Sequence, residues 1–105
     1  MKDSENILSV IKTTIKRYIP DAEVSLFGSR AKELATEESD YDILVVTQNE
    51  LTPKEKMPLK TTIRKDLLKL DIRTDILIQS QNEIRKKRRL PGHIIRSIIK
   101  ESILL

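Results

Sequence analysis

The sequence predicts an α/β domain of the α+β kind, in which a small mixed β-sheet of three or more strands is flanked by helices. The short, branched apolar run at 43–46 has the length and composition of a strand, and the segments 23–27 and 71–78 are two further strand candidates. The longer segments around them repeat apolar residues at steps of three and four, which is typical of amphipathic helices. A chain of 105 residues provides one modest core, so residues 1–105 are expected to form a single domain.

The N-terminal half is expected to alternate between helix and strand. Helical periodicity predicts a helix over residues 4–18, with Ser4 as its N-cap and its end before Pro20. A strand follows at 23–27, and the helix-forming residues at 30–35 predict a short second helix.

The next helix is expected to begin at Thr52-Pro53, after a polar connector, and to keep one apolar face as far as Leu70. Thr52 is suited to the N-cap position, and Pro53 to the first turn. Pro58 is expected to kink or delay this helix.

The C-terminal part predicts two more helices. Residues 80–89 form a charged segment in which Ser80 is expected to cap the helix and Glu83 occupies the capping-box position. Pro91-Gly92 then interrupts the pattern. A last helix carries a broad apolar stripe that suits either the core or a contact with a second chain: Ile94, Ile95, Ile98, Ile99 and Ile103.

Three aspartates are the candidate metal ligands. Asp40 and Asp42 open the apolar run 43–46, and alternate residues of a strand point to one face, so their carboxylates are expected to stand side by side. Mg²⁺ prefers such oxygen ligands together with substrate phosphates. Asp75 lies in the later strand 71–78. Three carboxylates from two strands can hold two divalent ions about 3.5 to 4 Å apart, which indicates displacement at a phosphoryl centre.

The carboxylate face of that strand is expected to be partly covered. Leu44 and Val46 share the face of Asp40 and Asp42, because they lie at even steps from them. A neighbouring helix or a partner is expected to supply the cover. Three apolar residues share the opposite face: Tyr41, Ile43 and Val45.

Gly28 and Ser29 form a candidate phosphate cradle between the strand 23–27 and the expected short helix. Glycine allows close approach of the backbone to a ligand, and the N–H groups of a helix start favour anions. Arg30 is expected to neutralise phosphate oxygens. Ser29 as a plain N-cap, and Arg30 paired with an acidic residue of its own helix, are the alternatives.

With Gly28-Ser29 followed ten residues later by Asp40-x-Asp42, and with Asp75 on a later strand, the chain resembles the minimal nucleotidyltransferases of the DNA polymerase beta superfamily. The C-terminal segment from Pro91 to Glu101 also resembles the terminal helix of such proteins, so the resemblance spans most of the chain. Members often carry Arg-Gly where this chain has Lys32-Glu33.

The resemblance implies a polymerase beta-like fold and Mg²⁺-dependent transfer of a nucleoside monophosphate from an NTP. Many similar proteins are antitoxins that pair with a helical HEPN-type toxin and attach AMP to its tyrosine hydroxyl. The resemblance thus implies ATP as substrate, two Mg²⁺ ions, and a hetero-oligomer with a toxin. It implies catalytic and metal-binding roles for Asp40, Asp42 and Asp75, and nucleotide-binding roles for Gly28, Ser29 and Arg30.

Two other functions fit the sequence. One is a binding antitoxin that neutralises its partner by steric occlusion, without need of the carboxylates. The other is an RNA-directed nucleotidyltransferase that uses the basic run 85–89. That run has no interleaved aromatic residues, so a solvated face or an acidic partner is favoured over nucleic acid. His93 is expected only to start the last helix.

Composition limits the remaining classes. Charged residues make up 34% of the chain and aromatic residues 3%, with a net charge of +4, which suits an anionic substrate without requiring nucleic acid. The absence of cysteine excludes disulfides and thiolate metal sites. No apolar run approaches the roughly 18 residues of a membrane span, so a cytoplasmic protein without membrane contact is expected. The nucleotide base, the acceptor and the oligomeric state are left open.

Overall fold

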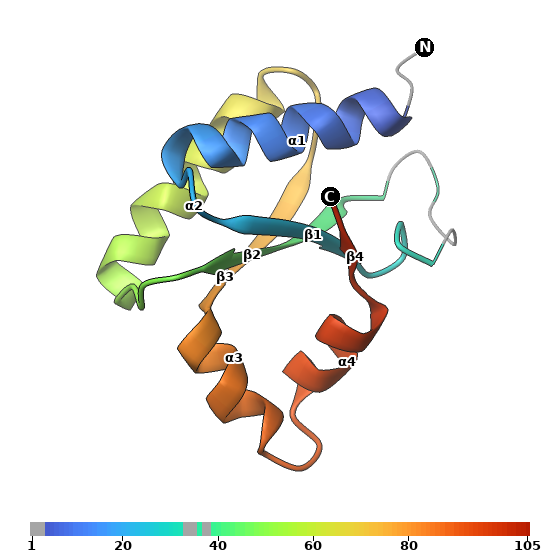
Figure 1. Cartoon of the computed structure of the whole chain (residues 1–105). Coiled ribbons are helices and arrows are strands. Elements are labelled where there is room, and N and C mark those ends of the chain that lie inside the picture. The colour runs from blue at the N-terminus through green and yellow to red at the C-terminus, as the bar shows by residue number, and fades with distance from the viewer. Residues whose placement is uncertain (1–3, 33–35, 37–38) are drawn as a thin grey trace.

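The computed structural model describes residues 4–32, 36 and 39–105 of the chain, except for the side chains of residues 4 and 5. Within these residues, a four-stranded sheet lies between two pairs of helices (Figure 1). The elements follow in the order α1 (Ser4–Tyr18), β1 (Glu23–Phe27), β2 (Tyr41–Thr47), α2 (Pro53–Leu68), β3 (Thr74–Ser80), α3 (Gln81–Arg88), α4 (Ile94–Glu101) and β4 (Ile103–Leu104). The predicted fold class, a mixed sheet flanked by helices, is confirmed.

The sheet has the strand order β3-β2-β1-β4. β2 and β3 are parallel and are joined through α2, whereas β1 runs antiparallel to both β2 and β4. A parallel pair needs such a long crossover, while the antiparallel strands need none. As a result, the end of β1 and the beginnings of β2 and β3 meet at one edge of the sheet, where Phe27 is opposite Asp42 and Asp42 is opposite Asp75.

The main core lies between the sheet and the first two helices, α1 and α2. Ile11 and Ile15 of α1 and Ile63 and Leu67 of α2 are fully buried. They pack against the face of β2 that the alternation of the strand predicts: Tyr41, Ile43 and Val45. Burial of these branched side chains, each worth about 1.5 to 3 kcal/mol, accounts for much of the stability of the fold.

The opposite face of the sheet carries a smaller apolar cluster. Leu44 of β2 is buried against Ile95 and Ile98 of α4. Helices of the chain itself therefore cover much of the carboxylate face, as the strand pattern predicted. The isoleucine stripe of α4 is divided: Ile95 and Ile98 belong to the core, whereas Ile94 is 69% exposed.

Cap residues fix the starts of three helices. Thr52 caps α2 and forms a capping box with Glu55, and Ser80 caps α3 and forms one with Glu83, as the sequence predicted for Ser80. His93 caps α4, because its Nδ1 accepts a hydrogen bond of 3.1 Å from the N–H of Ile95. The predicted role of His93 at a helix start is confirmed.

Several local features differ from the sequence prediction. The described part of the expected helix at 30–35, residues 30–32, forms turns, and 33–35 lie outside the described residues. β3 begins at Thr74 rather than at Asp71, because Asp71 has a positive φ of 61° that a strand does not allow. α2 begins at Pro53 without delay and continues through Pro58. Ile103, expected in the last helix, lies instead in β4, which pairs with β1 and was not predicted.

The helices in the described parts of the chain are all too short or too polar to span a lipid bilayer.

Candidate active site

Asp42 and Asp75 lie side by side at the edge where β2 and β3 begin. They are directly paired across the two parallel strands, so both side chains leave the sheet on the same face. Asp42 is half-buried and Asp75 is exposed. The structure thus brings together two of the three carboxylates that the sequence predicted as metal ligands, one sheltered and one accessible.

Burial raises the pKa of the Asp42 carboxyl, and the negative charges of Asp75 and Asp40 raise this pKa further. Each cause penalises the ionised form: desolvation removes water from the charge, and nearby carboxylates repel it. A perturbed carboxyl of this kind is typical of functional sites, because a bound cation or a shared proton relieves the repulsion.

Gly28 leaves room for the Asp42 carboxylate. Its φ is +74°, a left-handed conformation that glycine adopts without steric cost. A Cβ atom at this position would lie 2.1 Å from Oδ2 of Asp42, which is far inside van der Waals contact. The N–H groups of Ala31 and Lys32 then donate to the carbonyl oxygen of Gly28 at 3.1 and 3.3 Å, which makes a tight turn around Ser29.

Arg30 donates hydrogen bonds to the backbone of two residues shortly before Asp40. Its Nε and one terminal nitrogen donate to the carbonyl oxygen of Ser39 at 3.0 and 2.7 Å, and the same terminal nitrogen donates to that of Thr36 at 3.2 Å. Its guanidinium also lies over the Tyr41 ring, 4.0 Å from the centroid. The guanidinium thus contacts backbone oxygens of Thr36 and Ser39, and its role toward phosphate stays a prediction.

Asp40 lies just before β2 rather than within it. Its Oδ1 is 3.8 Å from Nε of Arg73, the residue before β3. In the part of the chain that the structure describes, no three acidic or histidine side chains are grouped closely enough to hold a metal ion. Asp40 therefore lies near the Asp42 and Asp75 pair without completing a three-carboxylate cluster.

Three contacts of the site were not predicted from the sequence. Arg73 pairs with Asp40, and Tyr41 lies under Arg30. Lys32, in the turn after Ser29, forms an ion pair of 3.0 Å with Glu101 at the end of α4. The position of Arg73, two residues before Asp75, was a local signal for a cation at this edge.

The residues of this edge fit a divalent cation by their chemistry. The charges of Asp75 and Asp40 repel the ionised Asp42 carboxylate and raise its pKa. A hard divalent cation such as Mg²⁺, which prefers oxygen ligands, would offset this repulsion. Gly28, without a side chain, allows the Asp42 carboxylate to lie against the backbone of the turn. Binding of a metal ion and a phosphate group at this edge stays a prediction.

Residues 8–105 match the sequence model of the nucleotidyltransferase domain family. No functionally curated protein matches the sequence of this chain.

Solved structures resemble the chain over nearly its whole length. One, described as a minimal nucleotidyltransferase, is 24% identical, with a TM-score of 0.64 and with 99% of this chain and 97% of that chain covered. A toxin-antitoxin structure with AMP-PNP contains a chain that is 20% identical, with a TM-score of 0.62 and coverages of 94% and 71%. These likenesses show the fold.

A further match comes from the tri-AMPylated Shewanella oneidensis HEPN toxin in complex with MNT antitoxin. The matching chain is 17% identical, with a TM-score of 0.59, and the alignment covers 95% of this chain and 69% of that chain. At this level of identity the likeness again concerns the fold.

Proposed function

The chain belongs to the nucleotidyltransferase domain family, and from this premise we propose that it transfers AMP from ATP to a hydroxyl group, a tyrosine, of a partner protein. The observation that carries the proposal is the pairing of Asp42 with Asp75 beside the side-chain-free Gly28. The partner would be a helical HEPN-like toxin, and the chain its antitoxin.

The three aspartates would bind the metal ion, and Asp75 would also act on the acceptor hydroxyl. Asp40, Asp42 and Asp75 would hold Mg²⁺, which supplies positive charge against the charge that develops on the transferring phosphate. Asp42 is half-buried and well fixed by the sheet, which suits a ligand. Asp75 is exposed at the same edge, which suits alignment of the acceptor hydroxyl and removal of its proton.

The turn at Gly28 would bind the triphosphate of the donor. Its backbone N–H groups and the Ser29 hydroxyl are donors suited to phosphate oxygens. In the reaction, the acceptor oxygen forms a bond to the α-phosphorus, and the bond from that phosphorus to the oxygen that bridges to the β-phosphorus breaks. Pyrophosphate leaves, and the hydroxyl proton passes to Asp75. The protein positions the reactants and stabilises charge, as in other phosphoryl transfers.

The choice of AMP and of a protein acceptor rests on the structural neighbours. One neighbour is a toxin-antitoxin structure with AMP-PNP, and another contains a HEPN toxin that is tri-AMPylated and bound to an MNT antitoxin. Their fold is shared by this chain, and the proposal carries their activity over to it.

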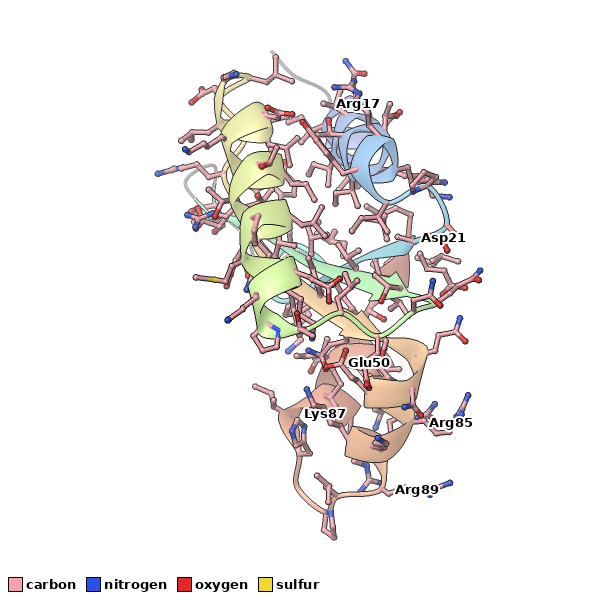
Figure 2. All side chains as sticks on the ribbon, turned by 90° about the vertical axis from the view of Figure 1, so that its left-hand side faces the viewer. Arg17, Asp21, Glu50, Arg85, Lys87 and Arg89 are labelled. Atoms are coloured by element: carbon pink, nitrogen blue, oxygen red, sulfur yellow. The ribbon has the colours of Figure 1, made fainter. Side chains whose placement is uncertain are left out.

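The test is incubation of the purified chain with a helical HEPN-like toxin, ATP and Mg²⁺, followed by intact-mass measurement of that toxin. We expect an added AMP, lost in Asp42→Asn and in the absence of Mg²⁺. Asp21→Asn is the matched control, because Asp21 is an exposed aspartate between α1 and β1 (Figure 2). Neutralisation of the partner without any adduct would contradict the proposal and would favour steric occlusion. An adduct formed only on RNA would contradict it in favour of an RNA-directed enzyme.

A further inference from the structure

The positive charge of the chain is concentrated in one helical hairpin, residues 81–101, which contains α3 and α4. This hairpin carries seven of the 20 basic residues and two of the 16 acidic residues, a net charge of +5. The other 84 residues, with 13 basic and 14 acidic side chains, have a net charge of −1. The net charge of +4 is thus a property of the hairpin and not of the whole surface.

Both acidic residues of the hairpin are already paired. Glu83 forms an ion pair of 2.8 Å with Lys56 of α2, and Glu101 forms one of 3.0 Å with Lys32. Among the described residues, no ion pair is formed by the basic side chains of α3. Figure 2 shows Arg85 of α3 and Arg89, the residue after α3, at the outside of the hairpin. The hairpin therefore presents cations that the described part of its own chain leaves uncompensated.

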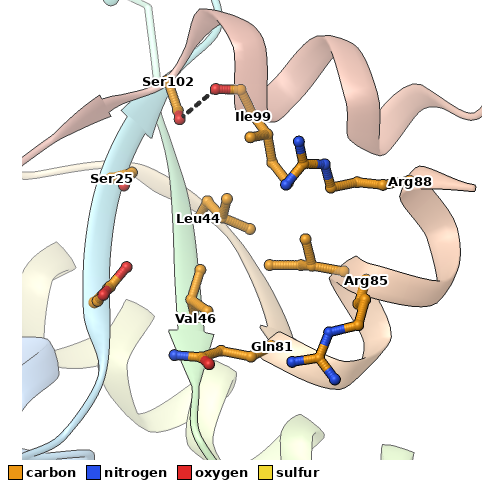
Figure 3. A pocket seen from close by; sticks show the side chains of 10 residues that line it. Ser25, Leu44, Val46, Gln81, Arg85, Arg88, Ile99 and Ser102 are labelled. Carbon is orange, nitrogen blue, oxygen red and sulfur yellow. Dashed lines mark hydrogen bonds between the residues drawn. The ribbon is translucent and has the colours of Figure 1, made fainter.

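A cavity of about 440 Å³ lies between this hairpin and the sheet (Figure 3). Arg85 and Arg88 of α3 line it on one side, and Ser25 of β1 on the other. Its volume is within the roughly 300 to 1,000 Å³ of binding pockets. Four apolar side chains also line it: Leu44, Val46, Ile84 and Ile99. The cavity combines apolar side chains with two guanidinium groups and one carboxylate, that of Glu23, so its charged lining is positive on balance.

This cavity lies on the same face of the sheet as Asp42, and Leu44 of its lining is two residues from Asp42 along β2. Its lining includes Glu23 and Val46, which are paired across β1 and β2 at the opposite end of the register from Phe27 and Asp42. The buried residues Leu44, Ile95 and Ile98 pack between sheet and hairpin. The described residues that line the cavity thus differ from those of the proposed donor site.

We propose that the cavity and the arginines beside it bind an acidic, amphipathic helix of a partner protein, whose apolar side chains enter the cavity while its carboxylates pair with Arg85 and Arg88. Complementary charge gives such a contact its orientation, and the apolar pocket gives it an anchor. Nucleic acid fits less well, because residues 81–105 contain no aromatic side chain on which a base would stack, and the apolar side chains of the cavity have no partner in a phosphate backbone.

The test measures binding of fluorescent probes to the full chain without ATP or Mg²⁺, so its result is independent of the proposed transfer reaction. One probe is a peptide of about 16 residues with leucines at helical spacing and glutamates elsewhere. The second is a scrambled peptide of the same composition, and the third is a single-stranded RNA of equal charge. The variant is Arg85→Glu with Arg88→Glu, and the control is Lys54→Glu with Lys60→Glu on α2, which changes the net charge equally.

We expect the peptide with leucines at helical spacing to bind at least roughly tenfold more tightly than its scrambled form. The arginine double variant should lose this binding, and the lysine control should keep it. Thermal melts show whether both variants are folded. Equal binding of the two peptides would reduce the site to unspecific charge attraction and overturn the proposal. Tighter binding of the RNA, lost in the arginine variant, would overturn it in favour of nucleic acid. The absence of binding by every probe would also overturn it.

Discussion

Gly28 and Asp42 are in such close contact that a Cβ atom on Gly28 would lie 2.1 Å from Oδ2 of Asp42. Gly28 follows the antiparallel strand β1 with a φ of +74°, and Asp42 is in the neighbouring strand β2. The glycine is therefore required twice, for the turn and for the position of the carboxylate. This contact links the two halves of the motif that the sequence presents as separate segments.

Gly28→Ala is expected to remove transfer activity and to destabilise the protein. The left-handed φ costs an L-residue about 1 to 2 kcal/mol, and the new methyl group must displace the Asp42 carboxylate. Activity and urea unfolding of the purified variant measure the two effects. Gly92→Ala is the matched control, since Gly92 has a φ of +71° but a Cβ atom there would meet nothing within 4 Å. Equal loss of activity in both variants would show that backbone strain alone matters.

Asp42→Asn is expected to stabilise the metal-free protein at neutral pH. The folded state raises the pKa of Asp42 through burial and through the charges of Asp75 and Asp40, so the ionised carboxylate opposes folding above that pKa. As the pH falls through the raised pKa, Asp42 takes up a proton and the advantage of the variant disappears. Melting temperatures over an acid-to-neutral series measure this, with Asp21→Asn as the exposed control. A variant that is less stable than wild type at neutral pH would refute the repulsion.

Glu83→Gln is expected to have the opposite pH dependence. Burial raises the pKa of Glu83, but hydrogen bonds from the Lys56 ammonium and from Ser80, with the Lys56 charge, lower it below its ordinary value overall. Ionised Glu83 therefore stabilises the fold above its unfolded pKa, and this contribution is lost as the pH falls through the folded pKa. Urea unfolding should show a loss of about 1 kcal/mol in the variant at neutral pH and none in acid. Glu50→Gln, at an exposed site, should show no such difference.

Arg30→Lys tests whether this side chain holds the loop before Asp40. Lysine keeps the charge but cannot contact the carbonyl oxygens of Thr36 and Ser39 and cover the Tyr41 ring together. We expect a loss of about 1 to 2 kcal/mol in unfolding free energy, whereas Arg64→Lys, at an exposed position on α2, should change little. An unchanged stability together with weaker ATP binding would assign Arg30 to phosphate instead.

The sequence was sufficient for the elements whose signals are local. Helical periodicity before Pro20 gives the bounds of α1, and the turn at Gly28 ends β1. Ser80 with Glu83 marks the start of α3. β4 could not be predicted, because Ile103 and Leu104 become a strand only by pairing with β1, far away in sequence. The described part of the expected helix at 30–35 forms turns, since tertiary contacts of Arg30 override helix propensity there.

The candidate site was predicted in its components but not in its geometry. The pairing of Asp42 with Asp75 depends on the register of two parallel strands, which the sequence does not define. The contact of Asp40 with Arg73 depends on the same register. Residue type and spacing thus identified the carboxylates, while the structure was needed to show that one is sheltered by Gly28 and another lies beside a cation.

The most direct measurement of the proposed transfer uses two samples of ATP, one labelled at the α-phosphorus and the other at the γ-phosphorus. Each is incubated with the chain, the HEPN-like partner and Mg²⁺, and label on the partner is counted. Transfer of a nucleoside monophosphate predicts label from the α-position only, falling at least about 10²-fold in Asp42→Asn and unchanged in Asp21→Asn. Label from the γ-position, or α-label that persists in Asp42→Asn, would contradict it.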